Sequence, residues 1–150
     1  MNCVLGFDYG ARTIGVAVGN LYTDTAHAAG TIKNSPKGPD WLSCDAIFSQ
    51  WQPDTLLVGL PLTMNGEEQA SSRAARAFAA MLEQRYRLPI ELVDERLSSV
   101  AASERFAQQR SHGQVRRKRA VDIDALAACV IVESWLNLKK SDSTKLVDHE

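Results

Sequence analysis

The chain has 150 residues, of which 45% are hydrophobic and 23% charged, values that are typical of one soluble globular domain and exclude a disordered chain. Its net charge of −1 points to no partner by itself, and its three cysteines, without a CxxC pair, support neither a disulfide framework nor a zinc knuckle. Neither a signal-like N-terminus nor an apolar run of membrane-spanning length is present, so we expect a cytoplasmic protein that does not enter a membrane.

The first part of the chain is predicted to form an antiparallel three-stranded unit. Alternating apolar residues predict strands over residues 3–8, 13–19 and 26–33. Only residues 9–12 separate the first two strands, a length that suits a hairpin and places Asp8 at a strand end beside the turn. The second strand carries Gly15, Ala17 and Gly19 on one side, so one of its faces is small.

Helices and strands alternate in the rest of the chain. The pattern predicts strands over residues 55–60 and 90–95 and helices over about residues 40–50, 65–86, 98–109 and 121–138. Asp40 is expected to cap the first helix, and Asn65 with Glu68 to form a capping box that opens the second. The side chains expected to face the core are Trp41, Leu42, Ile47 and Phe48 in the first helix and Ala74, Phe78, Met81 and Leu82 in the second.

This order of elements predicts the fold class. A three-strand unit followed by alternating strands and helices indicates an α/β fold with a mixed five-stranded sheet and helices on both faces. We expect a single domain over residues 1–138. Residues 139–150 have few apolar side chains and are expected to form a frayed tail.

Three acidic residues lie where core packing alone would not place them. Asp8 and Glu95 each close an apolar strand, and Asp124 lies in an otherwise apolar helix, in line with Ala128 and Ile131. A carboxylate that faces a sheet must be paired, protonated or bound to a cation. Because carboxylate oxygens suit Mg²⁺ or Mn²⁺, these acids are candidates for a metal site that hydrolyses phosphodiesters.

Each acid also has an ordinary structural interpretation. Asp8 could form the turn that follows it, and Glu95 could be a solvated strand end. Asp122 and Asp124 could be favourable acids in the first turn of a helix. The residues by themselves leave these alternatives open.

Positive charge is concentrated in residues 110–119, a segment that contains no acid. Its basic residues are Arg110, Arg116, Arg117, Lys118 and Arg119. The remainder of the chain is therefore net acidic, and the local field of this segment attracts polyanions such as nucleic acid. A solvated loop is the alternative interpretation.

Four motifs together resemble one known family. They are FDYGARTIGVAVGN, LLVGLPLTMNGEEQASSRAARAFAAML, LPIELVDERLSSVAA and VDIDALAACVIVESWL. In this order and spacing they resemble the YqgF/RuvX family of RNase H-like proteins, over nearly all of residues 5–138. The resemblance implies an RNase H-like fold and a metal-dependent endonuclease. Its role would be 5′-end maturation of pre-16S rRNA in ribosome biogenesis, or Holliday junction resolution in DNA recombination.

The resemblance also implies roles for particular residues. Asp8, Glu95 and Asp124 match the family's acidic positions and would hold one or two Mg²⁺ or Mn²⁺ ions, with Asp124 selected over Asp122. Arg12 would lie beside Asp8 and contact the scissile phosphate. The basic segment would bind the nucleic-acid backbone.

Two other classes of protein are alternatives. Sugar-kinase and actin-like ATPases also use a DxG hairpin on a related fold, but they close two such domains around a nucleotide and only one fits here. A non-catalytic nucleic-acid binding module would use the acids only to cap and pair. The expected partner is structured RNA or branched DNA, and the expected state is a monomer or a weak homodimer.

Overall fold

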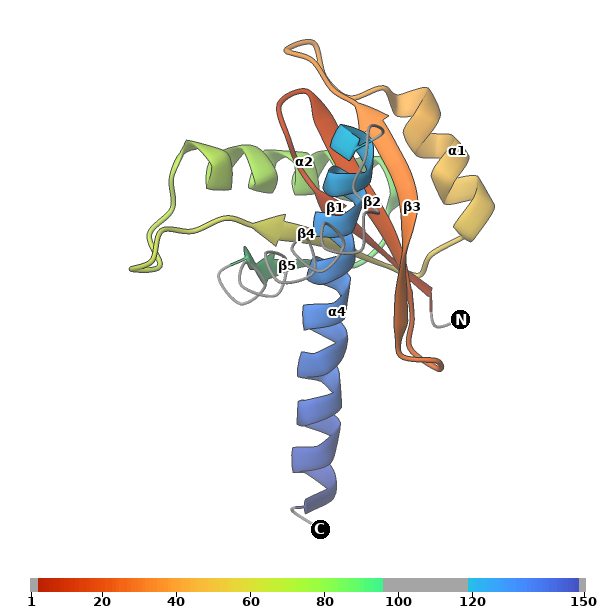
Figure 1. Ribbon diagram of the computed structural model, residues 1–150, viewed down its shortest axis with the longest axis vertical. Coiled ribbons are helices and arrows are strands. Elements are labelled where there is room, and N and C mark those ends of the chain that lie inside the picture. The colour runs from red at the N-terminus through yellow and green to blue at the C-terminus, as the bar shows by residue number, and fades with distance from the viewer. Residues whose placement is uncertain (1–2, 96–118, 149–150) are drawn as a thin grey trace.

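The computed structural model describes residues 3–95 and 119–148, and Figure 1 shows how their elements are arranged. In chain order these are β1 (Cys3–Asp8), β2 (Thr13–Asn20), β3 (Thr25–Lys33), α1 (Trp41–Trp51), β4 (Thr55–Leu60), α2 (Ala70–Tyr86), β5 (Ile90–Asp94) and α4 (Arg119–Asp148). All five predicted strands are present, with ends that differ by a residue at most. The helix predicted over residues 98–109 lies outside the described residues.

The strands form one sheet in the order β3-β2-β1-β4-β5. β2 pairs antiparallel with both β1 and β3, whereas β4 pairs parallel with both β1 and β5. This confirms the predicted mixed sheet with an antiparallel N-terminal unit. Because β1, β4 and β5 run in the same direction, their C-terminal ends lie at one edge of the sheet.

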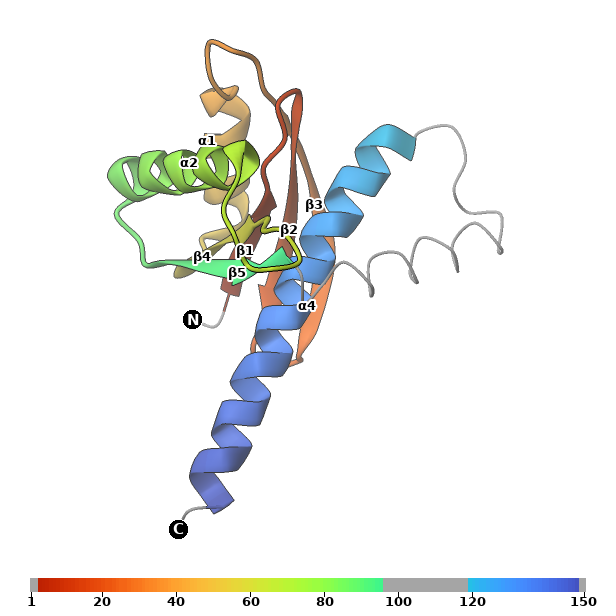
Figure 2. The same ribbon diagram turned by 90° about the vertical axis from the view of Figure 1, so that its left-hand side faces the viewer.

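Helices cover both faces of the sheet, as the sequence predicts. Figure 2 shows α1 and α2 on one side and α4 on the other. Alternate residues of one strand supply the two cores, since Leu5 and Phe7 of β1 join the core beneath α1 and α2, and Val4 joins the core beneath α4. In the same way, Leu56 and Leu57 of β4 point to opposite cores. The continuous apolar run of β4 is therefore buried on both faces.

Glycines line the part of the sheet over which α4 lies. A Cβ atom added at Gly15 would overlap the backbone carbonyl of Asp124, and one added at Gly6 would overlap the side chain of Val132. A Cβ atom added at Gly59 in β4 would overlap the side chain of Ile131 in α4. The missing side chains allow the helix backbone to approach the strands closely. The face of β2 that carries only small residues in the sequence is thus the surface on which α4 packs.

The substitution Gly15→Ala tests this close packing. We expect it to lower the free energy of unfolding by about 1–3 kcal/mol, because the added methyl group meets helix backbone that cannot rotate away. Gly6→Ala is the matched control and should cost less, because it meets the end of a valine side chain. Equilibrium unfolding in urea measures both values, and a Gly15→Ala variant as stable as the wild type would contradict the packing described.

The start of α2 differs from the prediction. The helix begins at Ala70 rather than near Asn65, and its capping box is formed by Gln69 and Ser72. Gly66 has a φ of 85° and turns the chain back before the helix starts. The capping box predicted from Asn65 was therefore wrong, since a second pair of polar side chains, closer to the helix, satisfies the free backbone N–H groups instead.

Some side chains assigned to a cap or to the core lie elsewhere. Glu68 forms a 2.6 Å ion pair with Arg76 instead of capping α2. Met81 and Leu42, both predicted to be inward, are 37% and 83% exposed. In α1 the core position is taken by Cys44, which is buried. The helical faces that pack on the sheet are thus rotated slightly from those that hydrophobicity alone selects.

α4 is longer than predicted. It continues to Asp148 instead of ending at Leu138, so the expected frayed tail is helical over most of its length. Figures 1 and 2 both show its C-terminal part extending beyond the sheet. Once a helix is nucleated, each further residue adds a backbone hydrogen bond at little cost, which allows extension through polar sequence. No helix within the described residues is long and apolar enough to cross a membrane.

Candidate active site

The three acids predicted from the sequence lie at one edge of the sheet, on the face covered by α4. Asp8 ends β1, and Glu95 directly follows β5. These strands are both parallel to β4, so their ends meet at the same edge. Asp124 lies in the N-terminal part of α4, and the backbone of α4 contacts the sheet at this residue.

Backbone packing holds these positions in place. Asp8 is the register partner of Gly15 in β2, and Gly15 lies directly against the backbone of Asp124. The carboxyl carbon of Glu95 lies 3.1 Å from the point that a Cβ atom of Gly59 would occupy. Gly15 thus allows the backbone of Asp124 to pack against the strand beside Asp8, and Gly59 leaves space for the carboxyl group of Glu95.

The charges of the three carboxyl groups influence one another. Burial, together with a smaller contribution from the nearby Asp124 carboxylate, raises the pKa of Asp8 to about 6. Burial, together with smaller contributions from Asp8 and Asp94, raises the pKa of Glu95 to about 7. Burial also raises the pKa of Asp124. Asp8 therefore lies within electrostatic reach of both other acids and occupies the centre of an acidic cluster, defined here as Asp8, Glu95 and Asp124.

The acidic cluster fits a divalent cation by its chemistry. Carboxylate oxygens are the ligands that Mg²⁺ and Mn²⁺ prefer, and a bound cation would offset the repulsion around Asp8. Within residues 3–95 and 119–148, no three His, Cys, Asp or Glu side chains are placed so that they could hold a metal ion by themselves. Mg²⁺ usually keeps several waters and binds through one or two carboxylates plus substrate phosphates, so an open cluster of this kind suits it.

The raised pKa values predict how the stability of the metal-free protein depends on pH. The pKa values of Asp8 and Glu95 rise from 3.8 and 4.5 to about 6 and 7, so the folded protein binds more protons than the unfolded chain between about pH 4 and 7. Stability from these groups is therefore lost as the pH rises through this window. We expect Asp8→Asn to stabilise the metal-free protein at pH 8 by on the order of 1 kcal/mol. This is less than the free energy that corresponds to the whole pKa shift, because the carboxyl group is partly solvated.

The comparison with pH 4 is the control for this prediction. Asp8 is protonated in the folded protein at that pH, so the advantage of Asp8→Asn should disappear. Urea unfolding of both proteins at the two pH values, with EDTA present, measures the difference. If the substitution destabilised the protein at pH 8, Asp8 would not lie in the repulsive environment described.

Arg12 lies in the exposed turn between β1 and β2, next to the end of the strand that carries Asp8. The turn is tied to the chain that follows β3, since the backbone N–H of Asn34 donates to the carbonyl of Arg12 at 2.9 Å. The side-chain amide of Asn34 also donates to the carbonyl of Gly10 at 2.8 Å. Arg12 is thus presented from an anchored turn, and its contact with a phosphate stays a prediction.

The loop between β4 and α2 leaves the sheet at the same edge as the acidic cluster, because β4 is parallel to β1. Figure 1 shows this loop extending away from the sheet. The backbone N–H of Glu67 donates to Oγ1 of Thr63 at 3.0 Å, and the hydroxyl of Ser72 donates to the carbonyl of Pro61. Ligands commonly approach α/β sheets at the C-terminal ends of parallel strands, so this loop lies beside the expected entry side.

Not all predicted site residues can be placed. The segment with Arg110, Arg116, Arg117 and Lys118 lies outside the described residues, as does the side chain of Arg119. Their contact with nucleic acid therefore stays a prediction.

Asp94 is a residue of the site to which the sequence analysis gave no role. It ends β5 and helps to raise the pKa of Glu95. The signal that could have found it is its position, because two consecutive acids close an apolar strand.

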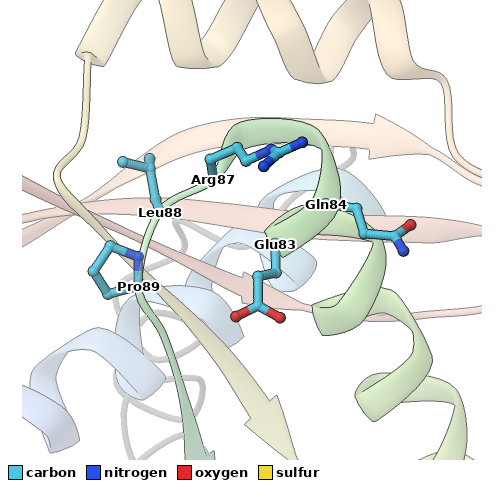
Figure 3. A pocket seen from close by; sticks show the side chains of 5 residues that line it. All are labelled: Glu83, Gln84, Arg87, Leu88 and Pro89. Atoms are coloured by element: carbon cyan, nitrogen blue, oxygen red, sulfur yellow. The ribbon is translucent and has the colours of Figure 1, made fainter.

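A depression at the opposite edge of the sheet is separate from the acidic cluster. Figure 3 shows the side chains that line it. They are Glu83, Gln84, Arg87, Leu88 and Pro89. These residues end α2 and precede β5, whereas Glu95 follows the other end of β5. The concave surface and the acidic cluster therefore lie at different ends of the same strand.

Comparison with solved structures defines the class of fold. A structure of Thermus thermophilus RuvC in complex with a Holliday junction substrate matches with a TM-score of 0.54 at 17% identity, over 93% of this chain and 97% of that chain. Another structure of Thermus thermophilus RuvC matches with a TM-score of 0.50 at 14% identity, over 91% and 96% of the two chains. The protein thus has the RuvC-like RNase H fold, as the sequence predicts.

Comparison of sequences defines the family. Residues 2–138 match the family model described as "RuvX: Holliday junction resolvase". A "Putative pre-16S rRNA nuclease" of Xanthomonas axonopodis pv. citri is 50% identical over 133 residues, which cover 89% of this chain and 86% of that protein. A protein of the same name from Xanthomonas campestris pv. campestris is 48% identical over 134 residues, with the same coverage. The chain therefore belongs to the RuvX family, which confirms the resemblance seen in the motifs.

Proposed function

We propose that this protein is a divalent-metal-dependent endonuclease that hydrolyses phosphodiester bonds of nucleic acid. The observation that carries the proposal is the placement of Asp8, Glu95 and Asp124 at one edge of the sheet, where burial and then repulsion from neighbouring acids raise the pKa values of Asp8 and Glu95. Three carboxylates in one partly buried region cost stability in the metal-free protein. Such an arrangement is typical of a site used for binding and chemistry rather than for folding.

Each residue of the acidic cluster would have its own role in binding the metal. Asp8 occupies the centre of the cluster and would contribute an oxygen ligand from the rigid end of a buried strand. Glu95 and Asp124 would complete the ligand set from either side. One or two Mg²⁺ or Mn²⁺ ions held there would supply the charge that activates a water molecule and stabilises the leaving oxygen.

Other parts of the chain would bind and orient the substrate. Arg12 projects from its anchored turn beside Asp8 and would contact the phosphate to be cleaved. The basic residues between Arg110 and Arg119 would bind the backbone without regard to sequence. The combined substitutions Arg116→Gln, Arg117→Gln and Lys118→Gln should then reduce the salt dependence of RNA binding, and an unchanged salt slope would refute this role.

The substrate that we favour is pre-16S rRNA during maturation of its 5′ end. Its support is the name carried by relatives about 50% identical over most of both chains. This role would place the protein in the bacterial cytoplasm, with Mg²⁺ as the abundant cation. Holliday junction resolution is the second candidate, because the matching family is described as a resolvase. Cleavage of a junction on two strands needs two active sites, so that candidate requires a symmetric dimer.

Cleavage assays with Asp8→Asn and Asp124→Asn test the proposed chemistry. Each substitution removes a charged oxygen ligand, so we expect kcat on a precursor 16S leader RNA to fall by at least about 100-fold. EDTA should abolish the activity of the wild type and Mg²⁺ should restore it. Asp54→Asn is the matched control, since Asp54 precedes β4 at the opposite edge of the sheet and should tolerate the same change.

The outcomes separate the candidate functions. A mobile four-way DNA junction incubated in parallel should be cleaved more slowly than the leader RNA, and the reverse preference would favour the resolvase. Undiminished cleavage by Asp8→Asn or Asp124→Asn would contradict the role of the acidic cluster. Salt-sensitive binding of both nucleic acids with no metal-dependent turnover would identify a non-catalytic binding module.

A further inference from the structure

A polar contact joins β5 to α4 at some distance from the acidic cluster. The indole Nε1–H of Trp135 in α4 donates a hydrogen bond to Oε1 of Glu91 in β5, at 3.0 Å. Trp135 is only 6% exposed, so its N–H depends on an acceptor within the protein. Lys139 adds to the contact, with its Nζ 3.8 Å from Oε2 of Glu91 and 5.3 Å from the centroid of the indole ring. We refer to Glu91, Trp135 and Lys139 as the β5–α4 clamp.

The residues of the clamp and of the acidic cluster lie on the same face of β5 and on the same face of α4. Alternation along β5 places Glu91, Val93 and Glu95 on one side, and Val93 packs in the core beneath α4. On α4, Asp124 and Trp135 are about three helical turns apart and therefore share a face. The separation along the strand from Glu91 to Glu95 is about 13 Å, and that along the helix from Asp124 to Trp135 is about 16 Å. α4 therefore crosses the sheet, with the backbone of Asp124 against Gly15 of β2 and the indole of Trp135, about three turns further along, against Glu91 of β5.

This contact needs a directional interaction. β5 is an edge strand of the sheet, and within the part of the chain that the structure describes it pairs with β4 alone. Glu95 and Asp124 are remote in sequence, so their separation depends on how α4 rests against the sheet. Apolar packing is non-directional and tolerates small rotations or shifts of a helix. A hydrogen bond with its donor on the helix and its acceptor on the strand fixes the rotation about the helix axis, and with it the direction of the Asp124 side chain.

We propose that Glu91 and Trp135 are positioning residues for the acidic cluster. Their hydrogen bond fixes α4 against β5 and thereby the separation between the carboxyl groups of Glu95 and Asp124. This inference rests on the proposed metal site formed by those acids. The ion pair of Lys139 contributes less than the hydrogen bond, because both of its side chains are nearly half exposed.

Binding of Mn²⁺, measured by calorimetry on the full chain, tests the role without a substrate. Glu91→Leu removes the acceptor, and Trp135→Phe removes the donor but keeps an aromatic ring. We expect each to weaken Mn²⁺ binding about 3- to 10-fold, less than the 10- to 100-fold typical of a residue bonded directly to a metal ligand. The double variant should bind Mn²⁺ no more weakly than the weaker single variant, because both changes remove the same bond.

Two further variants separate positioning from a general loss of stability. Glu91→Gln keeps a carbonyl acceptor at Oε1 and should bind Mn²⁺ as the wild type does. Asp45→Ala removes the hydrogen bonds that Asp45 accepts from Arg85 and Tyr86 between α1 and α2, on the opposite face of the sheet. It should lower the free energy of unfolding but leave Mn²⁺ affinity unchanged.

The results distinguish this inference from the proposed function. If the wild type binds no Mn²⁺, the metal site fails and the positioning role fails with it. If the wild type binds Mn²⁺ and Glu91→Leu and Trp135→Phe bind it equally well, the metal site stands and the positioning role is overturned. Equal weakening by Asp45→Ala would likewise overturn it, since the effect would then follow from stability alone.

Discussion

The arrangement of the protein depends on how closely α4 packs against the sheet. Side chains normally hold a helix well above a strand, but Gly6, Gly15 and Gly59 have none, and the helix backbone meets β2 at Asp124. The apolar residues of α4, among them Ile131, fill the space over the remaining strands. The geometry of the acidic cluster follows from this contact, because α4 brings its acid to the edge at which β1 and β5 end.

The same contact explains how an unfavourable cluster of carboxyl groups is maintained. Burial and mutual repulsion raise the pKa values of Asp8 and Glu95, so both groups oppose folding near neutral pH. The apolar core beneath α4 offsets this cost, at about 25 cal/mol for each Å² of apolar surface removed from water. Enzymes commonly sacrifice stability at the groups that bind metal or substrate. A cation bound by the cluster would recover part of that stability.

The sequence predicts the strands and the fold class better than the helix ends. Strand alternation is a short-range pattern, and it locates β4 and the two cores that β4 serves. The start of α2 was predicted wrongly because Asn65 and Gln69 both offer a polar cap, and the choice between them depends on the turn at Gly66. The extension of α4 to Asp148 could not be predicted from apolar periodicity, because its last residues are polar.

The candidate site could likewise be predicted from the sequence only where its residues belong to a local pattern. The ends of parallel strands identify Asp8 and Glu95, and the apolar line on the helix selects Asp124. The small face of β2 was visible in the sequence, but only the folded chain shows that Gly15 receives the backbone of Asp124. The hydrogen bond between Glu91 and Trp135 joins residues with no local pattern in common, so no motif could reveal it.

The most direct test of the account is a crystal structure of the protein grown with Mn²⁺, in which anomalous scattering locates the ion. We predict at least one Mn²⁺ within about 2 Å of a carboxylate oxygen of Asp8, with Glu95 or Asp124 as a further ligand. A structure in which Mn²⁺ binds elsewhere, while these three carboxylates are occupied by lysine or arginine side chains, would contradict the central claim.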